Sequence, residues 1–389
     1  MNKFNLNYFI FKSQNLYYKI KGIPSFKKYP YTSKKGKSII HISAFSHSNT
    51  GDLYLPVILR NLFNSFIPVK KWTNRHVFKI VKERDVISFN KADLIVIGGG
   101  GLFLKDTNPN ELSGWQWSCS IDMLKNIKSP IVAFAIGYNR FRGQEEFSPI
   151  FKEHLNIFVE KAIFIGIRNH GSIEKIKSYL KNDQLKNKLT FQPCMTTLTS
   201  LIYPNLCNYG KKEDFIAINC AFDRQSLRKS DDKILKSIAR VALRLSKITQ
   251  IKFYSHVFND EKILPFFDEI GVKYQLVRLK DIEDTVKEYA KPKLVIGMRG
   301  HAQMIPFGCN TPILSIISHD KMQWFLEDIH HPEWGVDVLD PSFEMKLYDT
   351  AISIYKNTSN IIPQLKKEQQ ELYEITKENM LKIKSLMLQ

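Results

Sequence analysis

The sequence KLVIGMRGHAQMIPFGCNTPILSIISHDKMQWFL, residues 293–326, decides the expected fold. Its apolar run 294–296 ends in a polar turn at 297–301, a helix-like segment follows, and a second apolar run, 313–317, leads into another polar turn. Strand, turn, helix and strand in this order make one βαβ unit. Because open α/β sheets bind ligands at the carboxyl ends of their strands, both polar turns are candidate ligand-contacting segments.

The same alternation of apolar strands and helical segments recurs along the chain in two blocks. In the first block we expect strands at 39–45, 93–97, 130–136 and 162–167. In the second block we expect strands at 215–219, 251–254, 274–278, 294–297 and 313–317, with helices such as 232–248 and 281–289 between them. Two such blocks predict an α/β fold of two Rossmann-like domains that face each other across a cleft.

The length of the chain supports this division, because 389 residues exceed one ordinary core and suit two domains. We expect a basic-aromatic arm at 1–37, an N-terminal Rossmann-like domain at 38–205 and a C-terminal one at 206–345. Residues 346–389 have a helical period and form the expected C-terminal helical tail.

The formal net charge of +19 favours anionic partners such as nucleic acid, an acidic membrane face, or phosphorylated and carboxylated small molecules. A lysine-rich codon bias explains the same excess equally well. The five scattered cysteines include no C-x-x-C pair, which indicates a reducing compartment rather than a disulfide framework or a zinc site. No apolar run is long enough to span a membrane, so we expect a cytoplasmic protein.

The expected arm at residues 1–37 mixes lysines with aromatic residues, and no Asp or Glu occurs before Asp52. One alternative is that the arm lies on an anionic membrane surface, which would place the protein at the inner face of the plasma membrane. The other is that the arm packs across the first domain with its lysines in water.

Arg299, Gly300 and His301 are the strongest candidates for chemistry, because they stand where an expected strand becomes a helix. The helix N-terminus offers free amides and the positive end of its dipole, and Arg299 adds a planar charge. Gly300 allows close approach of an oxyanion, and His301 can give or take a proton near neutral pH. A purely structural histidine is the alternative. Lys321, after the next strand, is a candidate phosphate contact.

Turns after the strands of the first block supply further candidates. Asn49 and Asp52 lie in a turn that suits either ligand contact or helix capping. Gly99 and Gly100 belong to a run of four glycines that fails to complete a dinucleotide fingerprint, and they leave room for a ligand or another backbone. Asp106 begins the loop that follows and is a candidate substrate contact.

Arg168 ends the last strand of this block, beside an expected helix with Ser172 as its N-cap, which is a suitable place for an anion. Adjacent histidines in a turn, as at His330 and His331, rarely share a metal without carboxylate or thiolate partners. No metal site is therefore expected.

Gly297-Met298-Arg299-Gly300-His301-Ala302, followed by Gly308, Pro312-Ile313 and Asp320-Lys321, resembles the C-terminal signature of polysaccharide pyruvyl transferases. The resemblance extends to Asn49-x-Gly51-Asp52, to the segment 92–100 and to Arg168-x-x-x-Ser172, and so covers most of the chain. It implies a GT-B-like fold of two domains. It also implies catalytic roles for Arg299, His301 and Arg168.

The activity implied by the resemblance is transfer of the pyruvyl unit of phosphoenolpyruvate onto two hydroxyls of a sugar. The product would be a pyruvate ketal on a capsule, exopolysaccharide or glycan precursor, with a lipid-linked acceptor as one alternative. Phosphoenolpyruvate is the donor substrate, and no cofactor is implied. The chain departs from the family pattern at Gly300, often leucine, at Asn169, often acidic, and at Gln192, where aspartate commonly precedes the proline.

Two other functions fit parts of the sequence. A GT-B glycosyltransferase with a nucleotide-sugar donor would use the same helix N-terminus for the diphosphate. A non-catalytic binder of polyanions or nucleic acid would explain the charge of +19. Because regular RNA- or DNA-binding motifs are absent, we expect no nucleic-acid partner.

Overall fold

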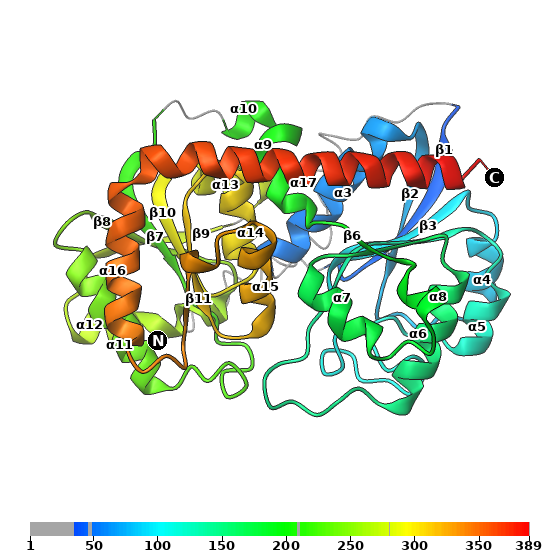
Figure 1. The fold of residues 1–389 in the computed structure, drawn as a ribbon, viewed down its shortest axis with the longest axis horizontal. Coiled ribbons are helices and arrows are strands. Elements are labelled where there is room, and N and C mark those ends of the chain that lie inside the picture. The colour runs from blue at the N-terminus through cyan, green and yellow to red at the C-terminus, as the bar shows by residue number, and fades with distance from the viewer. Residues whose placement is uncertain (1–34, 46–48, 208–210, 280, 389) are drawn as a thin grey trace, which may run out of the picture. The chain divides into compact units, whose positions relative to one another are not determined.

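The computed structural model describes residues 35–45, 49–207, 211–279 and 281–388. They form two compact units, each built around one parallel six-stranded sheet (Figure 1). We call them the N-terminal unit, which holds 35–45, 55–195 and 372–388, and the C-terminal unit, which holds 49–54 and 196–371. The predicted α/β fold of two Rossmann-like domains is confirmed, and the expected cleft stays a prediction. Most of the expected arm (1–37) lies outside the described residues.

The sheet of the N-terminal unit has the strand order β2-β1-β3-β4-β5-β6, with every pair parallel. Its strands are β1 (Lys37–Ser43), β2 (Val69–His76), β3 (Leu94–Phe103), β4 (Ile131–Tyr138), β5 (Phe164–Ile167) and β6 (Leu189–Phe191). Its helices are α3 (Thr50–Phe66), whose first residues belong to the other unit, α4 (Glu83–Phe89), α5 (Ile121–Asn126), α6 (Pro149–Lys161), α7 (His170–Lys177) and α8 (Asp183–Lys186).

The run of four glycines lies inside β3 rather than after it, because the strand continues to Phe103. A Cβ on Gly98 would lie 2.2 Å from the backbone oxygen of Phe134 on the neighbouring β4. Gly99 and Gly100 have φ of +78° and +96°, which side chains rarely tolerate. The predicted close approach is therefore made, at Gly98, by another backbone.

The sheet of the C-terminal unit has the order β12-β11-β10-β7-β8-β9, again with every pair parallel. Its strands are β7 (Glu213–Asn219), β8 (Gln250–Ser255), β9 (Tyr274–Arg278), β10 (Pro292–Gly297), β11 (Ile313–Ile317) and β12 (Gly335–Asp337). Counted from its own first strand, this is the 3-2-1-4-5-6 order of Rossmann folds. The order reverses between β7 and β10, and ligands of such sheets bind beside that point.

Helices cover both faces of this second sheet. They are α9 (Thr199–Ile202), α10 (Pro204–Cys207), α11 (Asp232–Leu245), α12 (Leu264–Glu269), α13 (Ile282–Ala290), α14 (His301–Gly308), α15 (Asp320–Asp328), α16 (Phe343–Lys356) and the start of α17 (Thr358–Leu386). Short 3₁₀ helices occur at Met195–Leu198, Phe258–Ile263 and Pro332–Trp334. Helix α11 packs against α16. Helix α13 packs against α14, and α13 and α14 each contact β10.

The expected helical tail consists of α16 and α17, and α17 contributes to both units. In the C-terminal unit, the buried Gln369 amide donates to the backbone oxygens of Thr197 and Gly308. In the N-terminal unit, Asn379 donates to the backbone oxygen of Phe191. Each part of α17 is thus fixed to its own unit by a side-chain amide.

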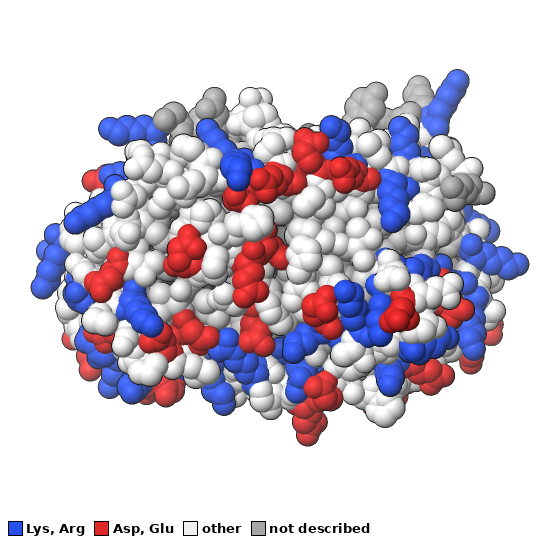
Figure 2. All heavy atoms as spheres, viewed as in Figure 1, with Lys and Arg blue, Asp and Glu red and all other residues white. Residues whose placement is uncertain are grey.

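Basic and acidic side chains are intermixed over the face that Figure 2 shows. The net positive charge of the sequence is therefore not gathered there into a field of one sign. Among the described residues, no helix combines the length and the apolar character that crossing a bilayer requires.

Candidate active site

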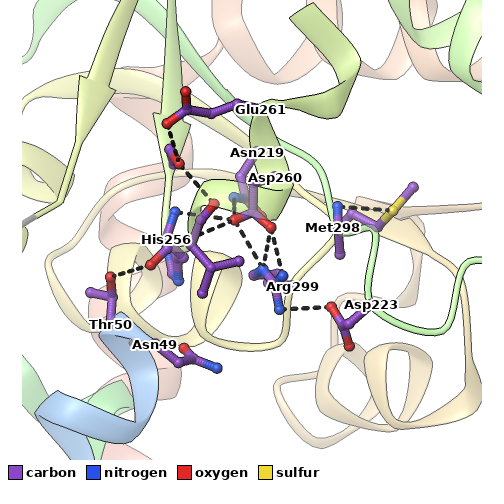
Figure 3. Close-up of polar contacts among 12 residues, drawn as sticks. Asn49, Thr50, Asn219, Asp223, His256, Asp260, Glu261, Met298 and Arg299 are labelled. Atoms are coloured by element: carbon purple, nitrogen blue, oxygen red, sulfur yellow. Dashed lines mark hydrogen bonds and ion pairs between the residues drawn. The ribbon is translucent and has the colours of Figure 1, made fainter. Parts of the chain in front are cut away.

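A buried polar network lies at the carboxyl ends of β7, β8 and β10, beside the point where the strand order reverses (Figure 3). Its centre is Arg299, two residues after β10, which lies between Asp260 and Asp223. Arg299 was predicted to serve the site because a strand ends beside it. Its two carboxylate partners come from other strand ends and were not predicted.

Asp260 forms the inner ion pair of the network. Its carboxylate is fully buried and accepts from Arg299 Nε at 2.9 and 3.0 Å and from Nη2 at 2.5 Å. The backbone amide of His256 (3.1 Å) and the amide of Asn219 (3.3 Å) donate to the same carboxylate. Burial opposes the charge of Arg299, but Asp260 and Asp223 more than offset this and raise the pKa of the guanidinium. Arg299 is therefore charged and fixed in place.

Asp223 forms the outer ion pair and comes from the loop after β7. Its carboxylate lies 2.9 Å from Arg299 Nη1, 3.0 Å from Arg228 Nη2 and 3.5 Å from Arg224 Nη1. Although burial alone would raise it, the pKa of Asp223 is held well below its ordinary value by Arg228 and Arg299. This carboxylate is ionised at all physiological pH values and cannot serve as a proton donor.

His301 is the first residue of α14, and its ring packs against Gly51. A Cβ on Gly51 would lie 2.0 Å from Nδ1 and 2.5 Å from Cγ of His301, so only glycine leaves room for this ring position. The structure thus brings Gly51, from the start of α3, to the predicted catalytic turn. Both residues belong to the C-terminal unit.

The neighbours of Gly51 have two different roles. Asn49 directly precedes α3, and its Oδ1 accepts from the Gly51 amide at 3.0 Å, as a capping side chain does. Asp52 lies in the first turn of the helix, and its charge contributes to the raised pKa of Arg299. Asn49 thus makes a capping bond and Asp52 contributes to the electrostatic surroundings of Arg299, while the substrate contacts expected of both stay predictions.

Gly300 has an ordinary helical conformation, with φ of −54°. A Cβ there would meet only Lys321 Cε, at 3.7 Å, which is a normal contact. The backbone therefore does not require glycine at 300, and a residue with a side chain would fit at this atom. The same distance places Lys321, in the first turn of α15, beside the predicted catalytic turn.

His256 joins this network, although no sequence pattern selected it. It follows β8, its backbone oxygen accepts from Thr50 Oγ1 at 3.4 Å, and its Nε2 lies 2.5 Å from the hydroxyl of Tyr289. Burial, with the nearby charge of Arg299, lowers the pKa of His256 to about 3, so the ring is neutral. The sequence did contain a signal for His256 and Asp260, because both follow the strand β8 within a few residues. Arg299 and His301 were predicted from the same kind of position after a strand.

The remaining predicted residues lie in the N-terminal unit. Arg168 is buried at the end of β5, with its guanidinium against Gly137. Asn169, not Ser172, is the N-cap of α7, because its Oδ1 accepts from the Ser172 amide at 2.8 Å; the expected cap was wrong. Ser172 Oγ instead accepts from the amide of Tyr138. Asp106 lies in the loop after β3 and accepts from Gln144 at 3.1 Å.

One group of described residues has ligand atoms close enough to hold a metal ion, namely His330, Glu368 and Glu371. His330 Nδ1 lies 2.8 Å from Glu368, and the Lys367 ammonium lies 3.4 Å from Glu371. The lysine already supplies positive charge to these carboxylates, and His331 pairs elsewhere, with Glu333. Each member of this group therefore has a partner within the chain.

The sequence matches the model of the family described as polysaccharide pyruvyl transferase over residues 4–320. No curated protein sequence matches the chain. The family match covers the turn at 299–301 and the segment 49–52 that packs beside it.

Three solved structures with low sequence identity illustrate what this chain is similar to in fold. A Thermobaculum terrenum O-GlcNAc transferase mutant has 10% identity and a TM-score of 0.51, covering 94% of this chain and 72% of its own. UDP-GlcNAc 2-epimerase from Neisseria meningitidis, bound to UDP-GlcNAc, has 10% identity and a TM-score of 0.52, covering 91% and 100%. UDP-N-acetylglucosamine 2-epimerase from Rickettsia bellii has 12% identity and a TM-score of 0.52, covering 89% of this chain and 97% of its own. These likenesses show the GT-B-like fold alone.

Proposed function

We propose a reaction for this chain on the premise that it belongs to the polysaccharide pyruvyl transferase family, whose model matches most of its length. The proposed donor is phosphoenolpyruvate and the acceptor is a sugar that offers two hydroxyls. One proton is added to C3 of the donor, both hydroxyl oxygens bond to C2, and the phosphate leaves with one of the two hydroxyl protons. The product is a cyclic pyruvate ketal.

The observation that supports this assignment most is the meeting of two family motifs around one histidine. The segment Asn49–Asp52 and the turn Arg299–His301 are far apart in sequence, yet Gly51 contacts the His301 ring. Helix formation does not explain a glycine at position 51, since alanine favours helix more. The contact with His301 does explain it, because the ring of this proposed catalytic residue occupies the space that a side chain would need.

His301 is the proposed general acid that protonates C3 of phosphoenolpyruvate. It stands at the N-terminus of the eight-residue helix α14, where free amides and the helix dipole favour an anion. Lys321 lies beside the same turn and would attract the phosphate as a point charge. Positioned acid catalysis of this kind contributes roughly 10²- to 10⁴-fold to a rate.

Arg299 would act on the donor as a guanidinium whose orientation is already fixed. Asp260 holds it from the buried side, so binding an anion would require little reorganisation of the side chain. Preorganised charge of this kind serves an oxocarbenium-forming reaction because the substrate anion is held while C2 becomes positive. The catalytic role of Arg168, in the N-terminal unit, stays a separate proposal that Arg168→Lys would test.

The experiment offers a panel of saccharide acceptors with phosphoenolpyruvate or with nucleotide sugars, and weighs the products. The proposal expects a three-carbon unit added from phosphoenolpyruvate, together with release of phosphate. Addition of a six-carbon unit from a nucleotide sugar would instead assign a glycosyltransferase. His301→Ala should keep donor binding and lose most turnover, and full turnover in this variant would remove His301 from the reaction.

The nature of the acceptor bears on where the enzyme works. We propose a glycan precursor of a surface polysaccharide, with a lipid-linked form as the alternative that would bring the enzyme to the inner face of the plasma membrane. Comparing binding to anionic liposomes with and without residues 1–37 tests this alternative. Unchanged binding after the deletion would remove the arm from membrane contact.

A further inference from the structure

The single negative charge of the Asp223 carboxylate lies among several positively charged side chains. Three guanidinium groups contact it, those of Arg299 at 2.9 Å, Arg228 at 3.0 Å and Arg224 at 3.5 Å. Lys321 is near enough to lower its pKa further. An anion that meets several cations at the carboxyl ends of β7 and β10 occupies the position where sheets of this order bind ligands.

Asp223 differs from Asp260 in burial and in hydrogen-bond partners, the two properties that decide whether a carboxylate can move away from Arg299. The side chain of Asp260 is completely buried, and backbone amides, Asn219 and Arg299 all donate to it. The side chain of Asp223 is 34% exposed and contacts three guanidinium groups. Rotating it into water would restore its hydration in exchange for these ion pairs, which an incoming anion would replace, and would leave Arg299 paired with Asp260.

Arg228 is prepared to hold an anion even if Asp223 turns away. Its side chain is 4% exposed. Nη1 donates to Ser318 Oγ at 2.8 Å, and Nε donates to the backbone oxygen of Asp223 at 2.8 Å. These two bonds fix the plane of the guanidinium without using the Asp223 carboxylate. Such a fixed fork binds carboxylates in a way that lysine cannot reproduce.

We propose that Arg228 is a further anion-binding residue of this site, and that the Asp223 carboxylate stands where the carboxylate of the three-carbon donor binds. Asp223 is then an internal competitor, which the donor displaces from between Arg228 and Arg299. The inference rests on the proposed function for the identity of the donor. It adds a residue pair that the sequence motifs do not select.

Whether Asp223→Asn strengthens or weakens donor binding distinguishes this assignment from a purely structural role of Asp223. If Asp223 competes with the donor, Asp223→Asn removes the competing charge, and phosphoenolpyruvate and pyruvate bind about tenfold more tightly, which corresponds to about 1.4 kcal/mol. If Asp223 only supports Arg299 and Arg228, the same change loosens both arginines and weakens binding. Arg228→Lys keeps the charge but loses the fork, and should weaken both ligands about tenfold.

Isothermal titration calorimetry of the full chain with phosphoenolpyruvate, and separately with pyruvate, measures these affinities. Glu344→Gln is the matched control, because it removes one carboxylate that pairs with Arg240 in the same unit and changes the net charge equally. Its affinities should equal those of the wild type. Urea unfolding confirms that each variant is folded, and Asp223→Ser replaces Asp223→Asn if the amide disturbs the loop.

Weaker or unchanged binding in the folded Asp223 variants overturns the proposal, as does equal tightening in Glu344→Gln or absence of binding in every protein. Turnover measured in parallel separates this result from the proposed function. Tighter binding without ketal product from any acceptor would keep the anion site and reject the reaction. Ketal product together with weaker binding in Asp223→Asn would keep the reaction and reject the site.

Discussion

Gly51→Ala tests whether the position of the His301 ring matters for catalysis. The new methyl group would lie 2.0 Å from Nδ1 and 2.5 Å from Cγ, whereas non-bonded atoms prefer about 3.5 to 4.0 Å. The ring must therefore move by about 1.5 Å. A displacement of about 1 Å in a reacting group can cost about 10²-fold in rate, so we expect kcat for ketal formation to fall about that much.

The fold should tolerate the same change. Alanine inside a helix is favoured over glycine by about 1 kcal/mol, which offsets the cost of moving one side chain, so the urea midpoint should shift little. Gly300→Ala is the matched control in the residue directly before His301, because its methyl group would meet only Lys321 Cε, at 3.7 Å. It should retain turnover within a few fold.

A double-mutant cycle completes this test. If Gly51→Ala acts through the ring, it should have no further effect on kcat when His301 is already alanine. Steady-state phosphate release from phosphoenolpyruvate, with the acceptor found in the mass assay, measures all four proteins. Full activity of Gly51→Ala, or losses that multiply in the double variant, would refute the reasoning.

Three further predictions concern stability and use urea unfolding. Asp260→Ala leaves the buried Arg299 short of its main partner and should cost about 3 to 5 kcal/mol, and adding Arg299→Ala should cost less than the sum of the two single changes. His256 has a pKa of about 3 in the fold and an ordinary value of 6.5 when unfolded, so the unfolded chain binds more protons between these values. Stability should therefore fall by about 2 kcal/mol between pH 6.5 and 5, and His256→Asn should flatten this slope. Gly98→Ala should cost about 3 kcal/mol because its methyl group meets the backbone oxygen of Phe134; a change below 1 kcal/mol would contradict the packing of β3 on β4.

Strands that are buried on both faces were predictable, because in parallel sheets such strands have continuous apolar sequences. Expected and observed bounds agree for β11 and also for the edge strand β9, and the ends of β7, β8 and β10 differ by one or two residues. The expected strand at 93–97 ended too early, because the glycines after it carry no hydrophobic signal. They continue β3, and at Gly98 the backbone of Phe134 lies too close to admit a side chain.

Strand β2 was not predicted, and its sequence VKKWTNRH explains why. It lies at the edge of its sheet and is largely exposed, so it lacks both an apolar run and regular alternation. Charged residues such as Lys70 and Lys71 suit an edge strand because they discourage pairing with other chains. β6 and β12 have three residues each, which is too short for any periodicity to show.

The candidate site was predictable only where one segment contained it. Arg299 and His301 follow a clear strand, and the rule that ligands bind at strand ends selected them. Asp223 and Asp260 come from the ends of two other strands, and their pairing with Arg299 depends on the strand order. That order cannot be deduced from hydrophobic patterns, because each strand looks the same whichever neighbour it pairs with.

Helix capping shows a second limit of sequence reasoning. Asn169 and Ser172 are both capping types, three residues apart, so the sequence alone did not decide which one begins α7. The structure places Asn169 at the cap and Ser172 one turn later. One family departure, Asn169 in place of an acid, thus has a structural role, since aspartate and asparagine cap equally well.

The most direct test of the account is a mass spectrum of the saccharide product formed from phosphoenolpyruvate in D₂O. If C3 is protonated during the transfer, the product carries a three-carbon ketal whose methyl group contains one deuterium, and the rate in His301→Ala tests whether His301 delivers it. His301→Ala should form this product about 10²- to 10⁴-fold more slowly. A product without donor carbons, or a labelled ketal formed equally fast by His301→Ala, would contradict the assignment of His301 as the acid of a pyruvyl transfer.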